Sequence, residues 1–216
     1  MFDQIPGSRF ARPGMTSWFI VYCFLFPFSL FANCLPHQTT PIVEITIPNW
    51  TYEIIQPREP MDLWHGSVIA RMQNDFEISA NKIETKNGAC ITLGAVHATI
   101  GYTDFRIQID ARHRQNSCEW DAILAHEKKH IDAYLSIIED YESQIIAAIK
   151  TASAAAQPIF INSNLELSAA LDALNYSVRN HPSVVLTLQK ISAAQEIRNL
   201  RIDQNSRTRE ALVLCN

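Results

Sequence analysis

One short stretch constrains this chain more than any other, His126-Glu127-Lys128-Lys129-His130. On a helix of about 3.6 residues per turn, two histidines four residues apart project about 40° from each other, so both rings reach one ion. Glu127 is offset by about 100° from His126, where its carboxylate lies beside such an ion and can take a proton from water. The pattern therefore predicts a helix with a zinc site, in which His126 and His130 are ligands and Glu127 is a general base.

The residues around this motif have the pattern of a long amphipathic helix. Asn116 is the expected N-cap, and Glu119 three residues later completes a box-like cap. Seven aliphatic residues fall within about 60° of one line on a helical wheel, whereas the motif histidines lie on a flank. They are Leu124, Ile131, Leu135, Ile138, Ile145, Ile146 and Ile149. We therefore expect one face of this helix to pack on a core and the motif to face a cleft.

The order of the other segments indicates the fold class. Alternating apolar and polar residues predict strands at about 42–48, 52–55, 75–85, 95–102 and 104–110. Two further helices are expected at about 163–179 and 183–201. Strands at about 42–110 followed by helices at about 117–201 predict an α+β fold, with a small antiparallel β-sheet half, the motif helix and two more C-terminal helices.

Residues 1–32 are set apart from this domain by their composition. A weakly basic start with Arg9 and Arg12 is followed by an apolar run from Trp18 to Ala32. This pattern predicts a signal peptide, and the alternative is a membrane anchor formed by residues 18–32. Residues 33–216 are then expected to form a single soluble domain outside the cytoplasm, periplasmic or secreted, or tethered to the membrane by that anchor.

The cysteines fit an exported domain. Without residues 1–32 four cysteines remain, Cys34, Cys90, Cys118 and Cys215. An even count behind an export signal predicts two disulfides, for which three pairings are possible. We favour Cys90–Cys118 together with Cys34–Cys215, because the second bond would join the two ends of the mature chain.

The residues around the motif resemble a known family. The run Ser117–Asp132 (SCEWDAILAHEKKHID) is similar to zincin-like His-Glu-x-x-His metallopeptidases, most of all to uncharacterised secreted bacterial proteins classed as zinc-dependent peptidases. The resemblance covers Cys90–Tyr134, with a weaker echo at Arg198–Asp203 and at Cys215. It implies a zincin-like fold in which the two motif histidines bind Zn²⁺ and Glu127 is the base.

The motif supplies two ligands, whereas a catalytic zinc site usually has three protein ligands and a water. A metzincin-type histidine six residues after His130 would fall on Ser136, so that pattern is excluded. We expect the third ligand from another element, and two candidates remain open. Glu196 is the candidate by analogy with zincins that take a glutamate from a later helix, and His181 is the candidate from an antiparallel arrangement of the helices.

Three other histidines are expected to lie outside the metal site. His65 and His97 are expected to face solvent or a hydrogen-bond partner. His113 belongs to the polar connection that precedes the motif helix, and we expect it to be an ordinary loop residue, the alternative being that it folds over the site.

These patterns predict an exported zinc-dependent metallopeptidase. Zinc lowers the pKa of a bound water to around 7 and polarises the scissile carbonyl, while Glu127 takes the water's proton and passes it to the leaving amine. The substrate is a peptide or protein, which we expect the strand Phe105–Asp110 to hold by edge pairing. The net charge of -4 gives no electrostatic reason to expect nucleic acid as a partner. The alternative is a non-catalytic cell-envelope binding or structural protein with an inert or structural metal site.

Overall fold

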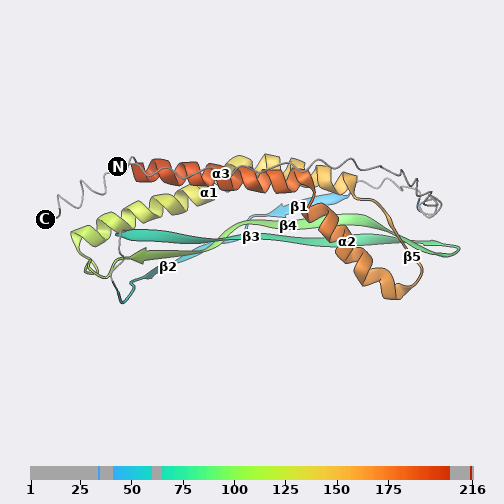
Figure 1. The fold of residues 1–216 in the computed structure, drawn as a ribbon, viewed down its shortest axis with the longest axis horizontal. Helices are drawn as coiled ribbons and strands as arrows, with labels where there is room; N and C mark the ends of the chain where they lie inside the picture. The colour runs from blue at the N-terminus through green and yellow to red at the C-terminus, as the bar shows by residue number, and fades with distance from the viewer. Residues whose placement is uncertain (1–33, 35–40, 60–64, 205–214, 216) are drawn as a thin grey trace, which may run out of the picture. The chain divides into compact units, whose positions relative to one another are not determined.

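A long antiparallel β-hairpin, β3 (Gly66–Thr85) and β4 (Gly88–Ile109), forms the centre of the fold (Figure 1). The computed structural model describes residues 34, 41–59, 65–204 and 215. The expected signal peptide or anchor at residues 1–32 lies outside these described residues. Among the helices that are described, none is long and apolar enough to cross a membrane.

The hairpin turns where Asn87-Gly88 predicts. Gly88 has a φ of 157°, and a Cβ at this position would collide with the carbonyl oxygen of Ile161. Glycine is therefore required at the start of β4, because any other residue would be strained and would clash.

Three short strands pair with β4 along its other side. β1 (Ile42–Thr46) and β2 (Thr51–Ile55) run parallel to β4, whereas β5 (Ile159–Ile161) runs antiparallel. The α+β class is confirmed, but the sheet is mixed and not antiparallel as expected. The reason is that β1 and β2 both pair with the same side of β4 and both run in its direction. Alternating apolar and polar residues predict a strand, but they do not predict the direction of its distant partner.

β4 is a single interior strand. Its residues 104–108 pair with β2 on one side, and β3 pairs along its whole length on the other. The two strands expected at 95–102 and 104–110 are therefore one, and the segment Phe105–Asp110 is not a free edge for a substrate. That prediction was wrong because neighbouring strands already use its backbone hydrogen-bonding groups.

Two β-bulges keep the large apolar side chains of β4 on one face. These side chains occupy even positions from Val96 to Tyr102 and odd positions before and after. The register with β3 shifts between Ser79 and Ala80 and again between Ala70 and Met72. Each extra residue on β4 reverses the alternation of faces, so one long strand continues to supply the core.

Three helices among the described residues cover the hairpin, α1 (Cys118–Ala155), α2 (Leu167–Arg179) and α3 (Pro182–Gln204). The short 3-10 turn η2 (Asn164–Glu166) leads into α2. α1 and α3 lie side by side, and α2 crosses the hairpin (Figure 1). The apolar residues of α1 and β4 form one continuous core, which includes Phe105, Ile123 and Ile137.

The start of α1 differs by one residue from the expected cap. Ser117 is the N-cap, in extended conformation, and its hydroxyl accepts a hydrogen bond from the Trp120 amide at 3.2 Å. Asn116, the expected cap, has a φ of 59°. Asparagine tolerates this left-handed conformation, and serine fits the extended conformation of a cap.

Two disulfides join Cys34 to Cys90 and Cys118 to Cys215. The favoured pairing of Cys90 with Cys118 was wrong. Cys90 lies at one end of β4 and Cys118 follows the other end, so about 60 Å of extended strand separates them, whereas disulfide-bonded Cα atoms lie about 6 Å apart. Two disulfides are typical of a protein in an oxidising, extracellular environment.

Replacing both Cys118 and Cys215 with serine is expected to lower the free energy of unfolding by at most about 5 kcal/mol. The bond joins positions separated by 97 residues, and its loss frees the unfolded chain. Urea unfolding of the oxidised proteins measures the difference. Peptide mapping without reduction is the control, and a peptide that links Cys90 to Cys118 would contradict the pairing.

Candidate metal centre

His126, His130 and Asp203 bring three donor atoms together. The Nε2 atoms of the two histidines lie 3.2 Å apart. The Asp203 Oδ1 atom lies 3.3 Å from Nε2 of His126 and 3.1 Å from Nε2 of His130. The histidines come from α1 and the aspartate from the last turn of α3, so the packing of two helices assembles this triad.

The size of this triangle suits a divalent metal ion. In a tetrahedral site with bonds of about 2.0–2.1 Å, neighbouring donor atoms lie about 3.3 Å apart. One face of an octahedral site with bonds of about 2.2 Å has edges of about 3.1 Å, so the triangle does not by itself choose the metal. The side chain of Asp203 is 45% exposed, against 12% and 10% for His126 and His130. Asp203 is therefore the member of the triad that solvent reaches most easily.

The histidines are held in the form that binds metal. Burial, followed by the neighbouring His130, lowers the pKa of His126 and favours its neutral ring. The Nδ1–H of His130 donates to the Asn199 Oδ1 at 3.1 Å, which leaves the lone pair of Nε2 directed at the triad. Asn199 itself is fixed, because its amide nitrogen donates to the Tyr134 hydroxyl at 3.2 Å and its oxygen accepts from Gln195 at 3.2 Å.

Glu127 follows His126 on α1, and its side chain is buried. Only 4% of the surface of Glu127 is exposed to solvent. A Cβ at Gly66 would lie 2.7 Å from Oε1 of Glu127 and 2.6 Å from Cγ2 of Ile123, so the carboxylate packs against the bare backbone at the start of β3. Burial, with a contribution from the charge of Asp203, raises the pKa of Glu127 to about 7. A bound cation would counteract this rise.

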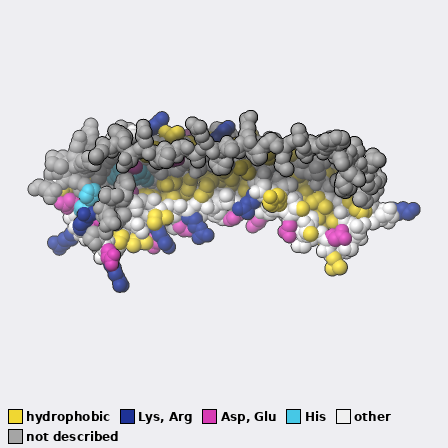
Figure 2. All heavy atoms as spheres, in the orientation of Figure 1, with side chains coloured by type: hydrophobic (Ala, Val, Ile, Leu, Met, Phe, Trp, Pro, Cys, Tyr) yellow, Lys and Arg dark blue, Asp and Glu magenta, His cyan; other side chains and the backbone are white. Residues whose placement is uncertain are grey.

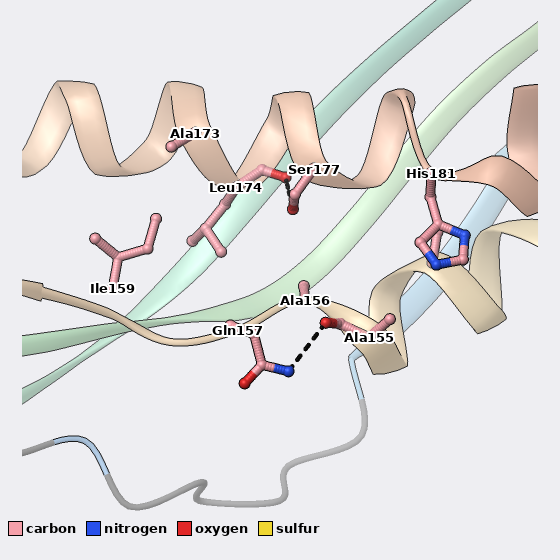
Figure 3. Close-up of a pocket in the computed structure, with 9 residues that line it drawn as sticks. Ala155, Ala156, Gln157, Ile159, Ala173, Leu174, Ser177 and His181 are labelled. Atoms are coloured by element: carbon pink, nitrogen blue, oxygen red, sulfur yellow. Dashed lines mark hydrogen bonds between the residues drawn. The ribbon is translucent and has the colours of Figure 1, made fainter. Parts of the chain in front are cut away.

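Neither expected third ligand reaches the triad. Glu196 lies on nearly the same line of α3 as Asp203 but seven residues earlier, about 10 Å back along the helix axis. His181 comes just before α3, about 33 Å from Asp203 by the same measure. Its ring lines a pocket with Leu174 (Figure 3), and its Nδ1 lies 2.8 Å from the Ser183 hydroxyl.

Asp203 was missed because α3 was expected to end at Arg201. In the structure the helix continues to Gln204, and Asp203 lies four residues after Asn199 on one side of α3. Both residues therefore face His130 together. The signal that could have identified them is the segment Arg198–Asp203, which carried the weaker part of the family resemblance.

Comparison with protein-family models, with curated proteins and with solved structures gave no match. The zincin resemblance therefore stays a prediction from the motif.

Replacing Asp203 with alanine is expected to remove about one metal ion per chain, because the triad loses its carboxylate and one of its three donor atoms. The matched control is Glu196→Ala, which removes a carboxylate from the same helix without touching the triad. Metal per chain after dialysis against buffered Zn²⁺ is the measurement. Equal metal content in the two variants would contradict the assignment of Asp203.

Replacing Asn199 with alanine is expected to weaken metal binding about 10- to 100-fold, because the Nδ1–H of His130 loses the acceptor that orients the ring. The conservative variant Asn199→Asp keeps an acceptor and is expected to restore most of the affinity. Competition with a chelator of known affinity measures both. The role assigned to Asn199 is wrong if the alanine variant binds as tightly as the unaltered chain.

Proposed function

We propose that this chain is an exported zinc-dependent metallopeptidase, periplasmic or secreted. The observation that carries this proposal is a buried glutamate, Glu127, next in the chain to His126 of a triad of metal donors whose aspartate, Asp203, is 45% exposed. Catalytic zinc sites have three protein ligands and an open position, whereas structural zinc sites are closed by four. Among the described residues, the cluster offers three donors.

Zinc is favoured over iron by the residue beside the ligands. Two histidines and one carboxylate also form the facial triad of iron oxygenases, and the size of the triangle suits either metal. Hydrolysis needs a base beside the site that can take a proton from water, and Glu127 supplies one at the adjacent position of the motif. The two disulfides agree with the exported location that we propose.

Different residues of the chain would carry out different parts of peptide hydrolysis. A zinc ion held by the triad would supply a Lewis acid that polarises the substrate carbonyl and acidifies water. Glu127 accepts the proton of the attacking water and returns it to the nitrogen of the departing amine. Gly66 lets the carboxylate lie close to β3, and Asn199 keeps His130 in one tautomer, so both groups are positioned before the substrate arrives.

The outer edge of β2 is the place where we expect an extended peptide to lie. Among the described residues, β2 pairs only with β4, so its other edge keeps free backbone hydrogen-bonding groups. The ammonium of Lys128, inside the motif, lies 5.5 Å from the ring centroid of Tyr52 on β2. This contact places β2 next to the motif helix, and the rings of Trp50 and Tyr52, each 44% exposed, offer apolar contacts to a substrate.

Replacing Glu127 with glutamine is expected to leave zinc binding intact and to reduce peptide hydrolysis about 10²- to 10⁴-fold, because the amide cannot accept the water's proton. The assay is hydrolysis of labelled casein and of a quenched-fluorescent peptide mixture by the zinc-loaded protein. Lys129→Gln is the matched control, since it changes an exposed residue of the same helix.

Two results would contradict the proposal. One is equal activity in the Glu127→Gln variant and the unaltered chain. The other is a zinc-loaded, folded wild-type protein that cleaves none of these substrates, which would favour a binding or structural role for the metal. Circular dichroism of each variant shows whether a loss of activity reflects a loss of fold.

A further inference from the structure

A second pair of facing imidazoles lies outside the triad. The Nδ1 atom of His65 is 3.0 Å from the Nε2 atom of His113, and the ring centroids are 5.1 Å apart. His65 comes immediately before β3, and His113 lies in the connection from β4 to α1. Histidine side chains gather at one end of the face shown in Figure 2. Segments that are 48 residues apart therefore bring two ring nitrogens together.

The backbones of both histidines are fixed by one residue, Asp110. Its amide donates to the His65 carbonyl at 2.9 Å, and its carbonyl accepts from the His113 amide at 3.0 Å. The Gln56 side chain donates to the His113 carbonyl at 2.7 Å. The Asp110 carboxylate is fully buried and accepts from the backbone and guanidinium of Arg112 at 2.7–2.9 Å. The pair is thus built on a rigid base, although its rings reach the surface.

We propose that His65 and His113 bind a divalent transition metal ion of the zinc class at a second site, separate from the triad. With bonds of about 2.0–2.1 Å, nitrogens 3.0 Å apart subtend about 95° at an ion, between the octahedral and tetrahedral angles. Neutral imidazole nitrogens are the ligands that zinc, copper and nickel prefer. His65 is exposed, so water can complete the coordination.

Such an ion would link the segment that precedes β3 to the segment that precedes α1. His65 is next in the chain to Gly66, against which Glu127 packs. His113 is four residues before Ser117, the N-cap of α1. Binding there would stabilise the folded arrangement of these segments, since the unfolded chain does not hold the two rings together. This proposal does not depend on the peptidase activity.

His97 provides a matched control within the same sheet. Its Nδ1 lies 2.9 Å from the Glu44 carboxylate, and its side chain is 52% exposed. It has the chemistry of a surface histidine with an acidic partner, but it belongs to no histidine pair among the described residues. Loss of His97 therefore measures the zinc that surface histidines bind without a built site.

The first experiment counts Zn²⁺ per chain in the full-length protein equilibrated with buffered zinc. We expect about two ions in the unaltered chain, about one in His113→Ala, about one in Asp203→Ala and none in the double variant. His97→Ala is expected to keep two. The proposal is overturned if the unaltered chain binds a single ion, or if His97→Ala loses as much zinc as His113→Ala.

The second experiment measures thermal unfolding with the triad disabled. In the Asp203→Ala background, added Zn²⁺ is expected to raise Tm, and the further change His113→Ala is expected to abolish that rise. An equal rise with and without His113 would overturn the proposal. This experiment tests the His65–His113 pair without the triad, so a negative result would not contradict the proposed peptidase. A negative result in the Glu127→Gln test would likewise not contradict the second metal site.

Discussion

The antiparallel contact between α1 and α3 is the interaction on which the candidate metal centre depends. Arg198 of α3 bonds to Ser136 and forms an ion pair with Asp140 of α1, and Ser183 donates to the carbonyl of Ala148 further along. These contacts set the register of the two helices. A slip of one turn, about 5.4 Å, would carry Asp203 away from the histidines, so the triad exists only in this register.

The hairpin gives this helix pair a surface long enough to pack on. β4 stays under α1 because two bulges return its apolar side chains to the same face after each interruption. The same hairpin also shapes the site. Gly66 at the start of β3 makes room for Glu127, so the sheet as well as α1 positions the proposed base.

Both sets of histidines are held in position by hydrogen bonds to a neighbouring polar residue. In the triad, Asn199 fixes His130 through its side chain, and in the second pair Asp110 fixes His65 and His113 through their backbones. His126 and His130 stand in the first half of α1, and His113 comes four residues before its N-cap, Ser117. In both sets a hydrogen-bonded polar residue holds the histidines in position, which is the arrangement that favours a defined ligand site.

Local chemistry explains what the sequence determined by itself. Periodicity predicted the α+β order, the three helices and the turn at Asn87-Gly88, and the four-residue spacing put His126 and His130 on one helix face. The direction of β1 and β2, the disulfide partners and the position of Asp203 beside the two histidines were decided only by tertiary structure. Each depends on which distant segments meet. The position of Asp203 also depends on the register of α1 and α3, which contacts such as the hydrogen bond from Arg198 to Ser136, 62 residues apart, establish. No pattern within a single segment carries that information.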